Sequence, residues 1–397
     1  MTQVGRISAS VPGSPVAIGG PSLARALWRI AAARVTSGNE ARLLVDGPET
    51  FDAMHALIAG ARTSIDFEHY YYSPDEVGRG FADALAAAAR RGVKVRVLLD
   101  WVGARRGTMG LMREVTQAGG EVRVFNTPGL RAWFGVLPRD HRKVLVADKR
   151  IGVTGGVGIG EAWARRLPTP RRVPWRDTAV ELRGPGATDL ARAFLVMWRR
   201  AGGERLSPAE RRARLQPSGS RLESGREPPA LVGIVEGEPG RARVARALQL
   251  TAVGAESTIW IATAYFLPSF REIEALAGAA RDGVDVRLLV PNRNDHQWVT
   301  WASRRIYGHL LRGGVRIWEW NGAMMHSKMS VTDGRVTRLG STDFNPLGVA
   351  VNYELDAFVD DATLGHAAGL QFLKDLDGST EVTLRDRRVV RADAGAP

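Results

Sequence analysis

Cysteine is missing from all 397 residues of the sequence. Its absence excludes disulfide bonds, thiolate nucleophiles and zinc or iron–sulfur sites with cysteine ligands. A chain without disulfides suits a reducing compartment, so we expect a cytoplasmic protein. Long apolar runs are missing too: no stretch of about 18 or more uncharged apolar residues occurs, and a membrane-spanning helix is therefore not expected.

Lysine is scarce. Only 5 of the 55 basic residues are lysines, and the remaining 50 are arginines. The formal net charge of +13 and the isoelectric point near 10.7 favour anionic partners such as phospholipid surfaces, nucleic acids or phosphate esters. A GC-rich genome also produces an arginine excess, but the guanidinium group remains the better bidentate partner for phosphate.

The N-terminal region has two parts. Residues 1–20 are rich in Ser, Gly and Pro, which is typical of a flexible tail. Residues 23–35 carry three arginines through what would be the apolar core of a secretion signal, so we do not expect export. One face of a helix in this segment would carry Leu23, Leu27, Ile30 and Ala31. Such an amphipathic helix either lies on an anionic membrane or packs against the protein.

One sequence pattern occurs twice, beginning at Thr63 and at Ser257. Each copy has a β-branched and aromatic run, an Ala-rich helix, and an apolar run typical of a strand buried on both faces. A second helix, ending at a glycine pair, and a further strand follow. Strand, crossover helix and strand indicate parallel pairing. The repeat predicts an α/β protein of two pseudo-symmetric halves, each a mixed, mostly parallel sheet flanked by helices.

The duplication also predicts the domain organisation. We expect a flexible tail with a possible amphipathic helix at 1–39, a first domain at 40–199 and a second at 230–397. The segment between them, 200–229, is polar, Arg-rich and interrupted by Gly and Pro, which indicates a linker or a surface loop.

Both copies contain the motif His-x-Lys-x-x-x-x-Asp. Its residues are His141, Lys143 and Asp148 in the first copy and His326, Lys328 and Asp333 in the second. Matching residues are 185 positions apart in all three cases, and two of the five lysines occupy matching places. Alternate residues of a strand project to the same side, so each motif aims an imidazole and an ammonium at one point. Pairing of the halves about a pseudo-twofold axis would bring both His–Lys pairs to a single phosphoryl group.

The two motif aspartates do not share this alternation. Asp148 and Asp333 fall at the ends of apolar runs, in the dipeptides Asp148-Lys149 and Asp333-Gly334, which are typical of hairpin turns. Each aspartate is therefore either a turn former or a support for catalysis, and the sequence leaves both alternatives open.

The doubled motif resembles the signature of the phospholipase D superfamily, and the resemblance covers roughly residues 40–200 and 240–360. It implies a single-chain pseudodimer with one active site that needs neither a metal nor another cofactor. His141 would attack phosphorus to form a phosphohistidine, and His326 would serve as acid and base. Lys143 and Lys328 would neutralise charge on the phosphoryl oxygens. The motif aspartates, Asp148 and Asp333, belong to the same candidate catalytic set.

Further matches to the superfamily supply supporting residues. Gly155-Gly156 and Gly340-Ser341 stand where the family carries small residues that let the backbone approach phosphate. Two positions later, Gly158 and Asp343 replace the usual asparagine. The segments WRD and NYE align, so Asp177 and Glu354 would orient the two histidines, with surface acids as the alternative. The supporting set is thus Gly155, Gly156, Asp177, Ser341, Asp343, Asn352 and Glu354.

Three segments resemble the bacterial cardiolipin synthases: 175–198, 264–268 and 340–348. This implies a phosphatidyltransferase that forms cardiolipin from phosphatidylglycerol and a second phospholipid, peripheral on the inner face of the cell membrane. The alternatives are a phospholipase D or a nuclease of the same superfamily, for which the positive charge would attract nucleic acid, and a catalytically silent binding module.

Aromatic and apolar residues flank the expected site. They are Leu130, Trp133, Phe134, Val136 and Leu137 before His141, and Trp298, Trp301, Trp318 and Trp320 in the second half. Amphipathic aromatic side chains suit a lipid headgroup boundary, and ordinary core packing is the alternative.

Overall fold

The structure is a computed structural model, and it describes residues 19–104, 106–127, 138–164, 173–204, 230–385 and 388–392. The apolar loop expected at 130–137 lies outside these residues, as do residues 1–18 of the expected tail and most of the expected linker.

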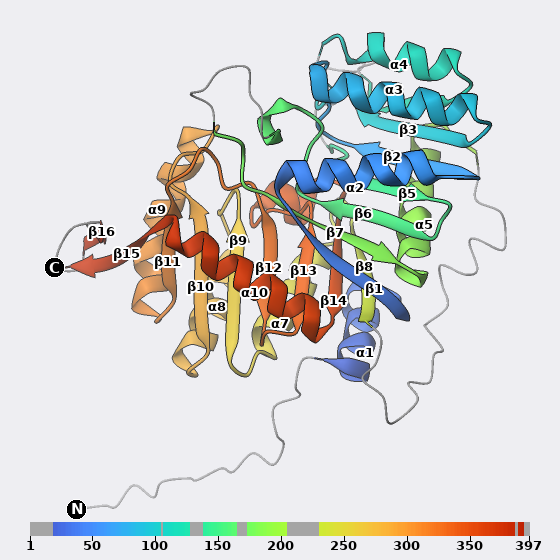
Figure 1. Cartoon of the computed structure of the whole chain (residues 1–397). Coiled ribbons are helices and arrows are strands. Elements are labelled where there is room, and N and C mark those ends of the chain that lie inside the picture. The colour runs from blue at the N-terminus through green and yellow to red at the C-terminus, as the bar shows by residue number, and fades with distance from the viewer. Residues whose placement is uncertain are drawn as a thin grey trace, which may run out of the picture.

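The described strands form one continuous sixteen-stranded sheet (Figure 1). The first half contributes β1 (Val35–Val45), β2 (Ser64–His69), β3 (Lys94–Asp100), β4 (Glu121–Phe125), β5 (Lys143–Ala147), β6 (Ile151–Gly155) and β7 (Thr178–Arg183). The second contributes β8 (Ala230–Gly237), β9 (Thr258–Thr263), β10 (Asp285–Pro291), β11 (Arg316–Trp320), β12 (Lys328–Thr332), β13 (Val336–Gly340), β14 (Glu354–Asp360), β15 (Ser379–Arg385) and β16 (Arg388–Arg391).

The strand order repeats the sequence duplication. The first half reads β1-β7-β6-β5-β2-β3-β4 and the second reads β8-β14-β13-β12-β9-β10-β11, with β15 and β16 added beyond β11. The two halves join where β1 pairs antiparallel with β8. The α/β class and the pseudo-symmetric arrangement predicted from the repeat are thereby confirmed.

The balance of strand directions differs from the prediction of a mostly parallel sheet. Parallel pairing is confined to β2–β3–β4 and β9–β10–β11, where crossover helices connect the strands. Neighbours elsewhere are antiparallel, including β5 with β6 and β12 with β13. Those pairs are joined by tight turns, and a tight turn can only reverse the chain. The sheet is mixed, with more antiparallel than parallel pairs.

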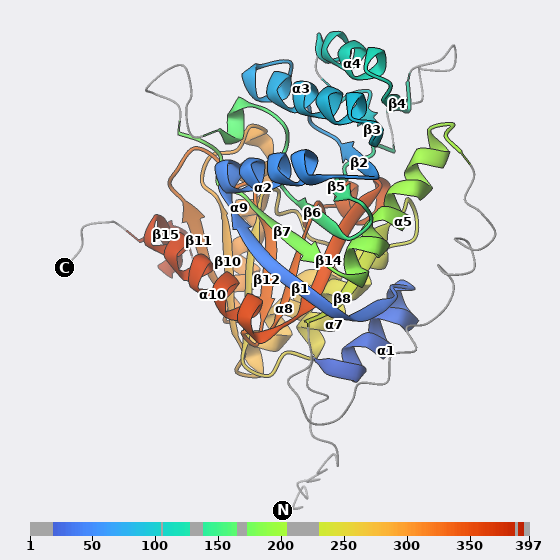
Figure 2. The ribbon, with the colours of Figure 1, turned by 45° about the vertical axis from the view of Figure 1, so that its right-hand side comes forward.

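Helices cover both faces of this sheet. They are α1 (Gly20–Ala31), α2 (Asp46–Gly60), α3 (Glu76–Arg90), α4 (Thr108–Gln117), α5 (Pro185–Arg200), α7 (Arg243–Val253), α8 (Phe270–Arg281), α9 (Gln297–Arg312) and α10 (Ala362–Asp377). Figure 2 shows α2, α3 and α4 together on one side of the first half, with α5 on another side. In the second half, α10 crosses one face of the sheet while α7, α8 and α9 pack on the other (Figure 1).

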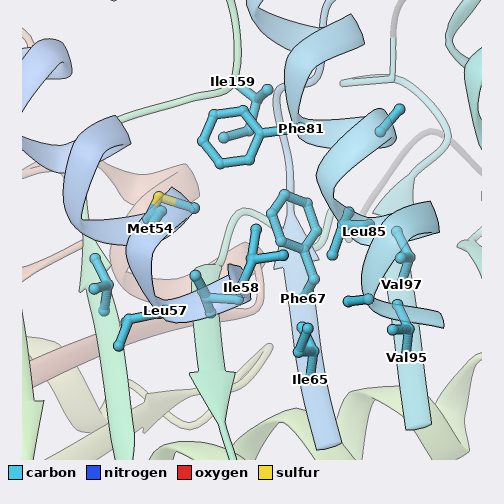
Figure 3. Packing of buried hydrophobic residues seen from close by; sticks show 14 of the residues in the cluster. Met54, Leu57, Ile58, Ile65, Phe67, Phe81, Leu85, Val95, Val97 and Ile159 are labelled. Atoms are coloured by element: carbon cyan, nitrogen blue, oxygen red, sulfur yellow. The ribbon is translucent and has the colours of Figure 1, made fainter. Parts of the chain in front are cut away.

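The core of the first half follows the alternation of its strands. Ile65 and Phe67 on β2 project to the same side, beside Val95 and Val97 on β3, and all four are buried. Figure 3 shows these side chains meeting the apolar faces of α2 and α3. Burial on this scale fixes the register of the strands, because a shift of one residue would turn the apolar side chains to the wrong face.

Helix α1 is packed on the protein. Its residues Leu23, Leu27 and Ala31 are buried, and they belong to a core cluster shared with α7 and β8. Of the two alternatives for this segment, the structure therefore supports the packed helix, since the apolar face is already covered. None of the helices in the described residues combines the length and the apolarity needed to cross a bilayer.

Candidate active site

Each motif histidine lies directly before a central strand, and each is bonded to the opposite half. The His141 backbone N–H donates to the Tyr353 carbonyl at 2.9 Å, and the His326 N–H donates to the Arg176 carbonyl at 2.7 Å. A hydroxyl contact between Thr178 and Ser327, at 2.5 Å, adds to the second of these junctions. The residues just before β5 and β12 are thus bonded to the opposite half of the protein. Both histidines therefore lie at the boundary between the halves.

The carboxylates that contact the histidines are exchanged between the halves. His141 Nδ1 lies 3.1 Å from the Glu354 carboxylate. His326 Nδ1 lies 2.7 Å from Asp177 Oδ2. With Nδ1 occupied in this way, Nε2 is the nitrogen of each ring that remains for a substrate. Each half thus supplies one imidazole and the carboxylate for its counterpart's imidazole.

Other groups hold the two carboxylates in place. The indole N–H of Trp163 donates to Asp177 Oδ2 at 2.9 Å, and the Thr178 N–H donates to its Oδ1 at 2.8 Å. Ser341 Oγ donates to the Glu354 carboxylate. The space that a side chain at Gly156 would need is filled by Asp177, so the glycine makes room for this carboxylate.

The two lysines lie beside the histidines but make different contacts. Lys328 Nζ donates to the His326 carbonyl at 2.8 Å and lies 3.1 Å from His326 Nε2 and 3.5 Å from Asp343 Oδ1. Lys143 Nζ donates to the His141 carbonyl at 2.9 Å. Both lysines lie over tyrosine rings, Tyr265 for Lys328 and Tyr70 for Lys143. The two halves therefore place their lysines in the same arrangement, but the contacts of Lys328 with the imidazole and with Asp343 have no counterpart at Lys143 among the described residues.

Burial and nearby positive charges lower the pKa of both imidazoles. The pKa of His141 lies well below its ordinary value because of burial and then the positive charges of Lys143 and Lys328, opposed by Asp343. The pKa of His326 is lowered well below its ordinary value by burial and by Lys328, Lys143 and His141. Charges from each half act on the histidine of the other half, as expected for groups that share one site.

Burial also shifts the pKa values of two carboxyl groups and one lysine of the site. Burial raises the pKa of Glu354 to about 8 and that of Asp177 to about 6, with the lysines opposing the rise. Burial, followed by repulsion from Lys328, lowers the pKa of Lys143 to about 8. A cluster of pKa values displaced toward neutrality marks a functional site, because groups that exchange protons need pKa values near the working pH.

Three other supporting residues lie close to this cluster. The Asp343 carboxyl accepts the Tyr265 N–H at 3.3 Å, and its pKa is raised by burial against the opposing charge of Lys328. Asn352 Oδ1 accepts the Arg139 N–H at 3.2 Å and so joins the halves next to His141. Gly155 is required by close packing, since a side chain there would collide with Ala179 on β7.

Asp148 and Asp333 lie at the opposite ends of β5 and β12 from the lysines. At about 3.3 Å per residue, five residues of strand separate Asp148 from Lys143 by roughly 16 Å. The Asp148 carboxylate accepts the N–H groups of Arg62, Thr63 and Ser64, and Asp333 accepts those of residues 256–258. The structure therefore supports the turn-forming alternative, and the inclusion of these aspartates in the catalytic set is corrected.

Sequence reasoning missed the aromatic lining of the site. The rings of Trp163 and Trp175 lie 5.3 Å from that of His326, and the Tyr70 ring lies 4.8 Å from that of His141. A signal existed for Tyr70, which belongs to the aromatic run in the first copy of the repeat. The sequence separation between Trp163 and Asp177 does not predict the hydrogen bond between them, because the two residues do not belong to the same helix or strand. Of the other tryptophans, Trp318 is buried in the core of β11, whereas Trp298 and Trp301 are exposed.

The described residues hold no cluster of three or more His, Asp or Glu side chains placed to bind a metal ion. The chemistry available from these residues is a pair of imidazoles with fixed tautomers, two ammonium groups for anionic oxygens, and an aromatic wall. This combination suits nucleophilic attack on a phosphorus atom with proton transfer to and from the departing and arriving oxygens.

Comparison with known proteins agrees with this geometry. The chain matches the family described as cardiolipin synthase, PLD-like domain, over residues 54–165 and 251–376. It is 32% identical over 356 residues to a cardiolipin synthase of Geobacillus kaustophilus, covering 89% of this chain and 69% of that protein. It is 28% identical over 354 residues to the major cardiolipin synthase of Bacillus subtilis, covering 88% and 72%.

The fold is also found among solved structures. The crystal structure of a phosphatidylserine synthase from Haemophilus influenzae matches with a TM-score of 0.67 at 16% identity, covering 90% of this chain and 91% of that one. At that identity the likeness concerns the fold. The family match extends over more than half of the chain, through both copies of the motif, and confirms the resemblance drawn from the motif residues. This chain belongs to the cardiolipin synthase family of phospholipase D-like proteins.

Proposed function

We propose that this protein is a phosphatidyltransferase of the cardiolipin synthase type, which forms cardiolipin from phosphatidylglycerol and a second phospholipid. The observation that carries the proposal is the exchange of carboxylates across the boundary, His141 with Glu354 and His326 with Asp177. These contacts hold the two imidazoles in defined tautomers at the boundary between the halves. A double displacement at phosphorus needs two such groups, one as nucleophile and one as acid and base. The relatives that are cardiolipin synthases supply the substrate class.

In the first step, His141 Nε2 attacks the phosphorus of a phosphatidylglycerol diester. A P–N bond forms and the P–O bond to the departing glycerol breaks. The departing oxygen takes a proton from Nε2 of His326, which enters this step as the imidazolium with Asp177 beside its Nδ1. In the second step, a hydroxyl of the acceptor lipid gives its proton to His326 as its oxygen attacks phosphorus, and the P–N bond breaks. Lys143 and Lys328 neutralise the phosphoryl oxygens throughout.

The assignment of roles to the two histidines draws on the broken symmetry of the lysines. Lys328 Nζ lies 3.1 Å from His326 Nε2 and 3.3 Å from Nδ1, so its positive charge lies against this ring and makes a His326 imidazolium a stronger proton donor. Both lysines donate to the carbonyl of their own motif histidine, but the His141 side chain keeps 16% exposure against 7% for His326. This supports His141 as nucleophile and His326 as acid and base.

The proposal includes action at a membrane. The phosphodiester substrates of the relatives are components of a bilayer, and a protein with a formal charge of +13 is attracted to anionic lipid. We therefore place the protein as a peripheral protein on the inner face of the cell membrane.

The test compares purified wild-type protein with His141→Ala and His326→Ala on phosphatidylglycerol vesicles, with and without EDTA. We expect cardiolipin from the wild type, unchanged within twofold by EDTA, and a loss of at least a thousandfold in each variant. Wild type quenched with alkaline denaturant should carry a covalent phosphohistidine that His141→Ala lacks. Cleavage of phosphatidylglycerol without transfer would identify a phospholipase, and cleavage of single-stranded DNA with no lipid product would identify the nuclease alternative.

A further inference from the structure

Large apolar side chains are exposed in two places on either side of the site. In the second half, Trp298 is 63% exposed and Trp301 is 59% exposed, both on α9. In the first half, Trp101 and Val102 are exposed directly after β3, and Met109 is exposed at the start of α4. Exposed tryptophans in this number are unusual on a soluble surface, where a large aromatic side chain is normally covered.

The topology places both groups at the edge of the sheet that carries the site. Strand β3 ends at Asp100, whose carboxylate accepts the N–H of Asp140, the residue before His141. Strand β10 runs parallel to β9, and β9 ends at Thr263, which pairs with Lys328. Helix α9 begins six residues after the end of β10, so its first two turns lie at this same edge.

The outer face of α9 has the chemistry of a lipid headgroup boundary. Trp298 and Trp301 are three residues apart and therefore share a face. Arg305 lies one turn further on, with its guanidinium 3.7 Å from the centre of the Trp301 ring. The opposite face is anchored in the core by Val299, Ser303, Tyr307 and Leu310. The exposed face is thus held rigidly outward, with indoles for the interface and a cation for lipid phosphate.

A groove lies against α9. It has a volume of about 720 Å³ and is lined by Asn292, Arg293, Asn294, Gln297, Thr300, Trp301, Arg304 and Arg305. The loop that forms its wall is tied to the site, because the Tyr265 hydroxyl donates to Asp295 at 2.9 Å and the Tyr265 ring lies 6.2 Å from the His326 ring. The loop before α9 is therefore connected to the catalytic site through Asp295 and Tyr265.

We propose that Trp298, Trp301 and Arg305 on α9, together with Trp101 and Val102 across the site, form the surface by which this protein docks on an anionic phospholipid bilayer. The inference rests on the proposed function and specifies where the membrane meets the molecule. A planar lipid surface fits better than a protein partner because the exposed apolar residues occupy two separate places along the edge that carries the site, and because Arg305 lies beside Trp301. The apolar face of α1 is buried and so cannot serve this purpose.

The experiment uses Trp298→Ser/Trp301→Ser in the full chain, with Val253→Ser/Leu370→Ser as the matched control. Val253 and Leu370 are also exposed, at the far end of α7 and on α10, so the control removes exposed apolar surface elsewhere. Circular dichroism and thermal melting establish that both variants fold. Binding is measured by co-sedimentation with vesicles of phosphatidylglycerol and of phosphatidylcholine, and turnover is measured on phosphatidylglycerol vesicles and on a water-soluble short-chain phosphatidylglycerol.

We expect the tryptophan variant to bind phosphatidylglycerol vesicles at least tenfold more weakly and to turn them over correspondingly more slowly. Its turnover of the short-chain substrate should stay within twofold, and the control should match the wild type in every assay. Equal vesicle binding by the tryptophan variant and wild type would overturn the proposal, as would an equal loss in the control. So would tryptophan-dependent binding of a single-stranded oligonucleotide without vesicle binding. Failure of the proposed function is separate: the wild type would then turn over neither lipid substrate, whatever its vesicle binding.

Discussion

Replacing Asp148 with asparagine should weaken folding and leave catalysis intact. Burial alone would raise the pKa of Asp148, but hydrogen bonds from Ser64, Thr63 and Arg62 outweigh it and lower the pKa to about 2. The closest contacts are the N–H and the hydroxyl of Thr63, both at 2.7 Å. These donors belong to the turn that leads into β2, so the carboxylate fixes the start of that strand beside the end of β5.

The magnitude follows from these contacts. Hydrogen bonds to a charged group contribute about 1.5–3 kcal/mol when buried, but this carboxylate is near solvent, so we take about 2 kcal/mol for the whole cluster. Asn retains one acceptor oxygen and tolerates the positive φ of 53° found at this position, so Asp148→Asn should cost about 1 kcal/mol. Asp148→Ala loses every acceptor and adds backbone strain, and should cost about 3 kcal/mol.

The assay combines thermal melting with turnover measured well below the melting temperature. Because the folded-state pKa is depressed, the stabilisation is present above the unfolded value near 4 and is lost as the pH falls toward 2. The difference in melting temperature between wild type and Asp148→Asn should therefore be full at pH 7 and narrow below pH 4. Asp333→Asn should behave likewise. A fall in kcat of more than tenfold in either folded variant would refute this reasoning and return the aspartates to the catalytic set.

Three further outcomes are expected. Asp177→Asn and Glu354→Gln should each lower kcat by roughly 10²–10⁴, because the imidazole loses the acceptor that fixes its tautomer; a loss below tenfold would contradict the orienting role. Turnover should fall as the pH rises through about 8, where Lys143 loses its proton, and Lys143→Arg should move that decline to higher pH since guanidinium stays protonated. A pH profile flat to 9.5 in the wild type would argue against this. Leu27→Ala should destabilise the fold by about 2–5 kcal/mol without weakening vesicle binding, because Leu27 is buried on α1; weaker binding at unchanged stability would point to α1 as the membrane element.

The sequence indicated the duplication and most of its consequences. The repeat beginning at Thr63 and Ser257 implied two matching halves, and the His–Lys spacing implied that each pair projects from one side of a strand. Both inferences use local properties, the period-two alternation of strands and the recurrence of a pattern, which the linear chain records directly. The excess of antiparallel pairs could not be predicted from these local properties. Whether two strands pair parallel or antiparallel depends on which strands become neighbours in the folded sheet.

The tertiary structure determined which residues contact each of the site carboxylates and Asp148. Asp177 and Glu354 were recognised as orienting carboxylates, but each contacts the histidine of the other half, and no spacing within one half contains that fact. The same limit applies to Asp148, whose turn position was visible but whose N–H donors lie more than 80 residues earlier in the chain.

What the sequence by itself determined is therefore the set of reacting groups and the two faces that carry them. Only the folded chain decided that α1 covers its apolar face on α7 and β8, that Trp318 enters the core, and that Trp298 and Trp301 remain outside. The physical reason is that amphipathic and aromatic residues gain free energy from burial against any suitable surface, and the sequence does not state which surface will be present.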